Sequence, residues 1–218
     1  MSATDAQAEY EARLTGFATL IHGNSPPGLA AKLAIFSELL RQQRNYGEEL
    51  WHIEPLLLPL MHSVEVDLHL SMARLLEPPK RSDRSLFKFL TFCEGNLSKI
   101  SWKNGQPTNA LISQQRAALE AHRATIDAIM GRRDRFFAHL DKEYFAKPTA
   151  IYSDYPLDED EVIDLANAMI GIVAEHEGGL QASWTINVAE LYTISVDNMV
   201  RNLRTGRQIN FPDQAKDF

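Results

Sequence analysis

Residues 109–141 read NALISQQRAALEAHRATIDAIMGRRDRFFAHLD. Apolar residues recur through this stretch at spacings of three, four and seven, the period of one face of a helix. Asn109 is a residue type that often caps a helix at its start. The apolar stripe consists of Ile112, Leu119, Ile126, Ile129, Phe136 and Leu140. The stretch therefore predicts a long helix that reaches at least His139.

Helical periodicity also dominates the rest of the chain. No segment shows sustained alternation of apolar and polar residues with hairpin turns, so strands are at most marginal. The expected helices cover residues 5–21, 29–44, 46–77, 82–92, 109–139, 157–177 and 187–204. We therefore expect the all-α class, with one domain over residues 1–218 built as a helical bundle of about six or seven helices.

Prolines, glycines and capping residues set the expected boundaries. Pro55 and Pro59 lie inside the third helix, which predicts a kink or a broken start and a continuous part that begins near Leu60. Ser82 or Asp83 is the expected N-cap of the short helix that follows. Further along, residues 96–108 predict a loop, residues 151–152 an extended segment, and residues 178–179 the end of a helix.

The composition is that of a globular protein with a sizeable core. The chain has 218 residues, of which 44% are hydrophobic and 23% charged. Its single cysteine, Cys93, cannot form an internal disulfide, which fits a reducing cytosol. We find neither a signal-peptide pattern nor an apolar run of about 18 residues, so we expect a cytoplasmic location and no membrane partner. The net charge of −7 argues against coating nucleic acid with the whole surface, but it leaves a local basic cleft open.

Several familiar chemistries have no signature in this sequence. There is no Gly-rich phosphate loop, no paired-cysteine zinc site and no Gly-x-Ser-x-Gly elbow. His62, Glu65 and His69 share one helix face, but a di-iron bundle needs Glu-x-x-His on two helices and two further glutamates. We interpret these three residues as a polar stripe at a helix interface. We expect neither a metal ion nor a cofactor.

Three arginines and a histidine gather near the end of the long helix, within residues 131–141. The guanidinium group is always charged and grips phosphate oxygens with a planar fork, and histidine gives and takes protons near neutrality. Histidine can therefore handle the proton of a ribose hydroxyl or of the leaving group, while arginine stabilises charge that develops on phosphorus. These are the groups needed to cleave RNA without a metal ion.

A similar spacing occurs earlier in the same stretch, at Arg116 and His122. Its register is typical of an ordinary solvated helix face. Spacing alone therefore does not distinguish the two arginine–histidine pairs, and the surrounding residues must. Arg133 is followed by Asp134, and His139 lies within Ala-His-Leu-Asp.

That context resembles the signature of the HEPN superfamily, and most closely its abortive-infection AbiU-like branch. Those proteins carry arginine, then Asn or Asp, then a basic residue, and later Ala-His-x-Asp. Residues 133–141 have this pattern, and residues 70–78 and Ser85-Leu86 also look like that branch. The resemblance covers roughly residues 45–145.

The resemblance implies a helical bundle that pairs as a homodimer, with the motif helix at residues 109–145 facing a cleft near the dimer interface. Active members are metal-independent endoribonucleases of toxin, antiphage and RNA-processing systems, some with an antitoxin partner. Other members only bind RNA or protein partners, and this alternative stays open. Carried over by position, Arg133, Asp134 and His139 are the catalytic candidates. An RNA cleavage of this kind leaves 2′,3′-cyclic phosphate ends.

The spacing of Arg133 and His139 poses a geometric problem. Six residues at about 100° each place them roughly 120° apart on a straight helix. Either the helix is distorted, or the Arg133 side chain wraps around it, or a partner protomer completes the site. Arg132, Arg135 and Lys142 are the candidate phosphate contacts, and Asp141 is expected to orient the arginine and histidine side chains.

Structural roles compete with these assignments. Arg133 could be a buried arginine paired with a carboxylate such as Asp67, a role compatible with catalysis. His139 could be a satisfied interface histidine. Phe136 and Phe137 are expected in the core rather than as base-stacking platforms. Arg201, Arg204 and Arg207 form a basic face for which solvation is the default interpretation.

Overall fold

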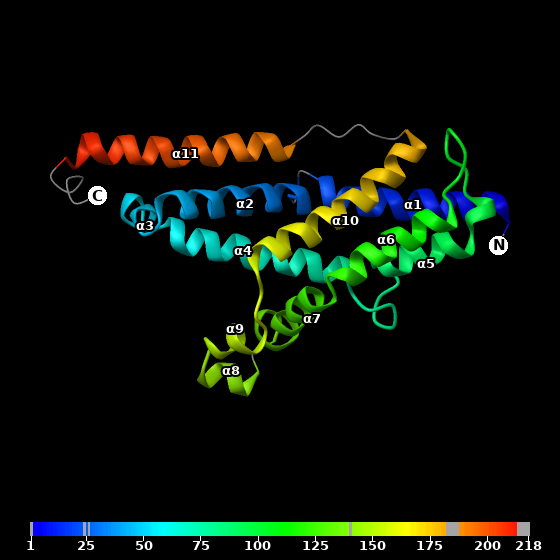
Figure 1. Cartoon of the computed structure of the whole chain (residues 1–218), viewed down its shortest axis with the longest axis horizontal. Coiled ribbons are helices and arrows are strands. Elements are labelled where there is room, and N and C mark those ends of the chain that lie inside the picture. The colour runs from blue at the N-terminus through cyan, green and yellow to red at the C-terminus, as the bar shows by residue number, and fades with distance from the viewer. Residues whose placement is uncertain (1, 24, 26, 140, 182–187, 213–218) are drawn as a thin grey trace. The chain divides into compact units, whose positions relative to one another are not determined.

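The computed structural model describes residues 2–23, 25, 27–139, 141–181 and 188–212, and these residues are overwhelmingly helical (Figure 1). The α-helices are α1 (Ala3–His22), α2 (Leu29–Tyr46), α3 (Glu49–Ile53), α4 (Leu57–Leu75), α5 (Leu86–Gly95), α6 (Asn109–Ala121), α7 (Arg123–Arg132), α8 (Lys142–Ala146), α9 (Ala150–Asp154), α10 (Glu159–Leu180) and α11 (Val188–Asn210). A 3₁₀ turn, η1 (Leu97–Lys99), and a π turn, η2 (Arg133–Phe137), complete the described elements. The all-α class is confirmed.

The number of longer helices also agrees with the expectation. Three of the described helices, α3, α8 and α9, have only five residues each. α6 and α7 divide what the sequence predicts as one helix. The longer units that remain correspond to the six or seven expected helices. None of the described helices combines the length and the apolar character needed to cross a membrane.

The chain divides into two compact units. The first takes residues 1–29 and 69–185, and it contains the arginine–histidine motif. α1 packs on α10 and α5 in this unit, while α6 packs on α5 and α10. The stripe expected for the first helix is buried, with Tyr10, Leu14, Phe17 and Ile21 all in the core. The expectation of one domain over residues 1–218 stays a prediction.

A polar network lies inside the core of the first unit. The Trp102 indole N–H donates to the Tyr10 hydroxyl at 2.9 Å. The Gln115 amide nitrogen donates to Glu175 at 2.8 Å, so the amide oxygen faces the fully buried His176 and accepts from its Nε2–H at 3.0 Å. Burial lowers the pKa of His176 to about 4, so the ring is neutral and its Nδ1 accepts from the Tyr10 hydroxyl at 2.9 Å. His176 is therefore the neutral Nε2–H tautomer.

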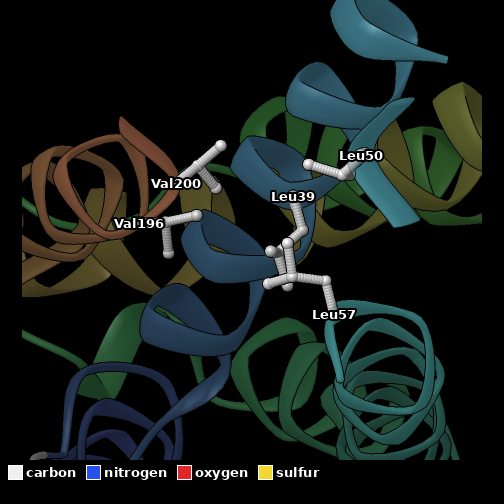
Figure 2. Packing of buried hydrophobic residues seen from close by; sticks show 5 residues of the cluster. All are labelled: Leu39, Leu50, Leu57, Val196 and Val200. Atoms are coloured by element: carbon white, nitrogen blue, oxygen red, sulfur yellow. The ribbon is translucent and has the colours of Figure 1, made fainter. Parts of the chain in front are cut away.

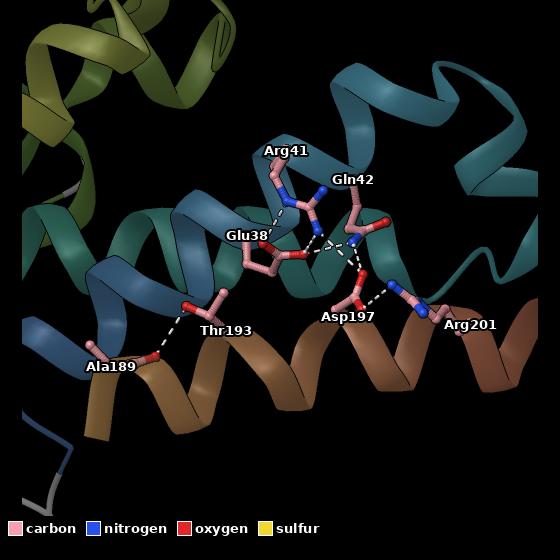
Figure 3. Close-up of polar contacts among 7 residues, drawn as sticks. All are labelled: Glu38, Arg41, Gln42, Ala189, Thr193, Asp197 and Arg201. Carbon is pink, nitrogen blue, oxygen red and sulfur yellow. Dashed lines mark hydrogen bonds and ion pairs between the residues drawn. The ribbon is translucent and has the colours of Figure 1, made fainter. Parts of the chain in front are cut away.

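The second unit takes residues 30–68 and 186–218, and it joins α11 to α2, α3 and the start of α4. Its core is apolar: Figure 2 shows Leu39, Leu50 and Leu57 with two valines of α11, Val196 and Val200. Beside this core, the carboxylate of Asp197 on α11 accepts hydrogen bonds from Arg41 and Gln42 on α2 and pairs with Arg201 (Figure 3). Apolar packing and a polar network thus both hold α11 within the second unit.

Several predicted boundaries differ from the structure. The long helix is not continuous, because His122 ends α6 with non-helical ψ and its Nδ1 lies 3.0 Å from Glu161 of α10. Thr108, rather than Asn109, caps α6 by accepting from the Leu111 N–H. Ser85 caps α5 in place of Ser82 or Asp83.

Three further differences concern proline and glycine. α4 begins at Leu57 rather than Leu60, because Pro59 falls in the first turn, where a missing N–H leaves no helix bond unmade. Residues 151–152 are helical, within α9, where Ile151 is fully buried. α10 continues through the glycine pair to Leu180 and ends at Gln181, in the left-handed region at φ 52°. The predicted start of the last helix, Asn187, lies outside the described residues.

Candidate active site

The motif lies in a distorted part of the helix. After α7 the chain forms the π turn η2, in which the Ala138 N–H donates to the Arg133 carbonyl five residues back, at 2.9 Å. The next bond is wider still, from the Asp141 N–H to the Arg135 carbonyl at 3.0 Å. A π turn is rare and frequently marks a functional site. Helix distortion was one of the three alternatives that the motif spacing left open.

Arg133 is held by two carboxylates of the first unit. Its guanidinium donates to Glu77 at 2.5 Å and to Asp134 at 2.8 Å, and its side chain is only 13% exposed. Burial alone would lower the pKa of Arg133, but the hydrogen bonds to Asp134 and Glu77 raise it above its usual value. The expected buried pairing is therefore present. Its partner is Glu77, two residues beyond the end of α4, whereas Asp67 accepts a hydrogen bond from Lys32.

Asp134 connects two arginines. Its second carboxylate oxygen accepts from Arg81, in the segment between α4 and α5, at 2.9 Å. Burial would raise the pKa of Asp134, but the hydrogen bonds from Arg133 and Arg81 lower it. Arg81, Asp134, Arg133 and Glu77 thus form a chain of alternating charges, which we call the motif charge chain. In this geometry Asp134 orients arginines and is not poised to act as an acid.

His139 lies just beyond the π turn and is exposed to solvent. Its ring makes no hydrogen bond or ion pair with another described residue. No hydrogen bond joins it to Arg133 within the described part of the chain. An exposed imidazole without a fixed partner is available to a ligand that approaches from solvent.

The other two motif arginines differ sharply from each other. Arg132 is buried, donates from Nε to the Tyr155 carbonyl at 2.9 Å and stacks over the Tyr152 ring. Burial makes Arg132 a packing residue here rather than an open phosphate contact. Arg135 is partly exposed, pairs with Asp141 at 3.2 Å and donates to the Tyr155 hydroxyl. That hydrogen bond to Tyr155, more than any other contact, raises the pKa of Arg135.

Asp141 and Lys142 follow the π turn at the start of α8. Asp141 forms an ion pair with Arg135, and it precedes α8 as its N-cap residue. Lys142, the first residue of α8, is exposed. Arg135 and Lys142 are therefore the two predicted phosphate contacts that solvent can reach.

Residues 28–201 match the model of a protein family described as AbiU2, within the HEPN group. The chain belongs to the HEPN AbiU2 family. The match covers most of the chain and includes the whole π turn, so the resemblance seen in residues 133–141 is confirmed. Membership suggests a nuclease or abortive-infection role. No curated protein and no solved structure matches the chain.

The apolar residues around the motif of this HEPN chain are partly or fully buried within the first unit. Ile126 is buried. Phe136 and Phe137 are half-buried, and their rings contact Tyr144 and His69 respectively. Leu140, the last residue of the predicted apolar stripe, lies outside the described residues.

The second arginine–histidine pair of this HEPN chain, Arg116 and His122, forms ion pairs with carboxylates of neighbouring helices. Arg116 pairs with Glu94 at 3.2 Å, and His122 with Glu161 at 3.0 Å. His62 pairs with Glu65 on α4 at 3.5 Å. Among the residues that the structure describes, no group of three or more histidine, cysteine, aspartate and glutamate side chains is arranged to hold a metal ion.

Sequence reasoning missed Glu77, Arg81 and Tyr155. Glu77 stands in the stretch quoted for the family resemblance, directly before Pro78-Pro79, but nothing in the spacing says that it reaches Arg133. Tyr155 supports two motif arginines and requires Gly131, because a methyl group there would overlap the Tyr155 ring. Glycine in the middle of a helical motif was the available signal for a close approach.

Proposed function

We propose that this HEPN chain is an endoribonuclease of the toxin or antiphage defence type that cleaves RNA without a metal ion. The observation that carries the proposal is that the π turn holds an arginine fixed by two carboxylates and is followed, two residues after its end, by an exposed histidine. The fixed guanidinium supplies a preorganised positive charge, and the exposed imidazole supplies a group for proton transfer.

The proposed reaction is an attack of the ribose 2′-oxygen on the adjacent phosphorus. The 2′-hydroxyl loses its proton to a base, the bond from the 2′-oxygen to phosphorus forms, and the bond from phosphorus to the 5′-oxygen breaks. The leaving 5′-oxygen takes up a proton. The products carry a 2′,3′-cyclic phosphate and a 5′-hydroxyl, and His139 performs one of the two proton transfers.

Arginines stabilise the charge that develops on phosphorus in this mechanism. Arg133 is close to its two carboxylates, so a phosphate that binds it must share or displace one of them. Arg135 and Lys142 are accessible and are the proposed contacts to the flanking phosphates. Asp134 and Asp141 keep the guanidinium groups oriented rather than exchanging protons themselves.

A symmetric homodimer would bring a second His139 to the site and supply the second proton transfer. We propose this assembly, with an antitoxin as a further partner, in the cytoplasm. Sedimentation of the purified chain over a range of concentrations tests the assembly. A monomer at every concentration would remove the composite site from the proposal.

The experiment that tests the proposed function is cleavage of end-labelled RNA in excess EDTA. We expect cleavage to persist and the product to resist 3′-end labelling until the cyclic phosphate is opened and the resulting monophosphate is removed. Loss of cleavage in EDTA that a divalent ion restores would contradict the proposal.

A binding module without catalysis is the second candidate. Two observations favour it: the carboxylates already neutralise Arg133, and the chain carries a net charge of −7. A positive field normally helps a nuclease to attract RNA. RNA binding with no cleavage under any of these conditions would support this second candidate.

A further inference from the structure

The short helix α8 follows the motif directly and presents an aromatic side chain to solvent. Figure 1 shows α8 and α9 beyond the end of α7, within the first unit. Phe145 on α8 is 75% exposed, the largest exposed fraction among the large hydrophobic side chains that the structure describes. An exposed phenylalanine of this degree has an apolar surface that water solvates poorly.

Contacts of the preceding residue fix the direction of Phe145. Tyr144 is fully buried, and its hydroxyl donates to Asp154 of α9 at 2.9 Å. The Arg135 guanidinium lies over the Tyr144 ring, 5.5 Å from its centre, and the Phe136 ring meets it edge-on. Successive helical residues point about 100° apart, so an anchored Tyr144 holds Phe145 outward. The exposure of Phe145 therefore follows from the fixed orientation of α8.

The carboxylates beside Phe145 in the sequence contact Arg135 rather than the lysines. Asp141 and Glu143 both face Arg135, with N···O separations of 3.2 and 4.0 Å. Lys142 and Lys147 are exposed and form no ion pair with another described residue. Lys142, Phe145 and Lys147, which we call the α8 face, therefore combine two exposed ammonium groups with one exposed ring.

We propose that the α8 face binds a single-stranded segment of the RNA substrate, with an unpaired base stacked on Phe145 and the neighbouring phosphates on Lys142 and Lys147. Aromatic rings and cationic side chains are the two groups with which proteins hold unpaired strands, and stacking tolerates any base. Bases inside a duplex are already stacked and cannot reach the ring. The inference rests on the proposed function for its choice of RNA, and it adds the substrate class.

A second copy of the chain is a less suitable occupant of the α8 face. In a two-fold dimer both subunits use the same surface patch. A contact through the α8 face would therefore bring Lys142 and Lys147 of both copies together, and like charges repel across a contact. A polyanion has the complementary charge.

The test measures RNA affinity by fluorescence anisotropy in the His139→Ala background, which prevents cleavage during the titration. The probes are a labelled single strand of mixed sequence and the same strand in a duplex. The variants are Phe145→Ala, Phe145→Leu and Phe145→Trp. Phe211→Ala is the matched control, because Phe211 is 53% exposed and lies in the second unit.

We expect Phe145→Ala to weaken single-strand binding about 5-fold to 150-fold, the usual range for loss of one stacked base, and to leave duplex binding unchanged. Phe145→Trp retains affinity, Phe145→Leu loses most of it, and Phe211→Ala has no effect. Three results would overturn the proposal: Phe145→Leu binding as tightly as the parent, an equal loss for duplex and single strand, or a dimer that Phe145→Ala converts to a monomer.

A parallel cleavage assay with His139 intact separates this inference from the proposed function. If Phe145→Ala changes neither cleavage nor single-strand affinity, the inference is refuted, while the proposed nuclease activity is unaffected. Single-strand binding that depends on Phe145, without any cleavage, refutes the nuclease and supports the α8 face. Binding of neither RNA by the parent chain refutes the inference.

Discussion

At the scale of single residues, the chemistry of this chain depends on how Arg133 is held. Its planar fork spans Glu77 and Asp134, which lie on segments far apart in the sequence. A lysine has one charged point on a flexible stem and cannot reproduce that bridge. The motif charge chain thus contributes to local stability and fixes the orientation of the Arg133 guanidinium.

Arg133→Ala and Arg133→Lys should both abolish RNA cleavage. The alanine variant leaves the partly buried Glu77 without its arginine partner, so the free energy of unfolding should fall by about 2 kcal/mol. Urea denaturation and cleavage of labelled RNA measure the two effects. Arg123→Ala is the control, because Arg123 pairs with Glu120 on the surface of the preceding helix. Full activity of Arg133→Lys would show that the planar fork is unnecessary.

Gly131→Ala tests the close approach of Tyr155. The added methyl group overlaps the tyrosine ring, which must move and take its hydroxyl away from Arg135. The Tyr155 carbonyl, which accepts from Arg132, belongs to the same residue. We expect a loss of about 1–3 kcal/mol in unfolding free energy, typical of overpacking, together with reduced cleavage. Gly171→Ala on α10 is the matched control, because the space beside Gly171 is open and alanine favours a helix. Equal behaviour of the two variants would contradict the role of Tyr155.

At the scale of helices, apolar periodicity predicted most of the elements, because each long helix buries one stripe. It did not predict the break at His122. The apolar spacing from Leu119 to Ile126 continues through that point unchanged, whereas the break accompanies a contact between His122 and Glu161, a residue of another helix. The π turn was anticipated only as a geometric problem, since six residues on a straight helix separate Arg133 from His139.

The motif could be located from sequence, but its partners could not. Local spacing identified Arg133, Asp134 and His139 through the family resemblance. It offered a carboxylate such as Asp67 as the partner of a buried Arg133. The partner is instead Glu77, beyond the end of that helix, and only the tertiary packing decides between them. Burial of Arg132 under Tyr152 and Tyr155 depends on α9, which the sequence pattern did not predict.

Attachment of α11 within the second unit should depend on its buried valines. Val200 is fully buried, so Val200→Ala should lower the unfolding free energy by about 2 kcal/mol through lost burial and a small cavity. Leu191→Ala, on the same helix, removes a side chain that is 59% exposed and should change the unfolding free energy by less than about 0.5 kcal/mol. Thermal denaturation of both variants measures the difference. Equal shifts would mean that α11 does not pack as described.

At the scale of the molecule, stability should depend on pH through His176. Burial lowers the pKa of His176 to about 4, while in the unfolded chain it takes its ordinary value of 6.5. The unfolded chain therefore binds the proton first. The stabilisation is complete above pH 6.5 and is lost as the pH falls from 6.5 towards 4, by about 3 kcal/mol in all.

Urea denaturation at a series of pH values tests this dependence. The His176→Gln variant cannot titrate at this position, so it should be less stable than the parent at pH 7 and lose less stability between pH 6.5 and 4. The partners of His176, Tyr10 and Gln115, remain in place in this comparison. Identical slopes for parent and variant in that interval would exclude His176 as the source.

The measurement that tests the central claim most directly compares His139→Ala with His122→Ala on labelled RNA. The two histidines flank the same motif segment, but only His139 is exposed without a partner among the described residues, whereas His122 pairs with Glu161. We predict that His139→Ala lowers the cleavage rate about 10²- to 10⁴-fold, the usual contribution of a positioned acid or base. His122→Ala should cleave like the parent and leave the same 2′,3′-cyclic phosphate ends, with circular dichroism showing both variants folded. Equal cleavage by the two folded variants would contradict the assignment of His139 as the catalytic histidine.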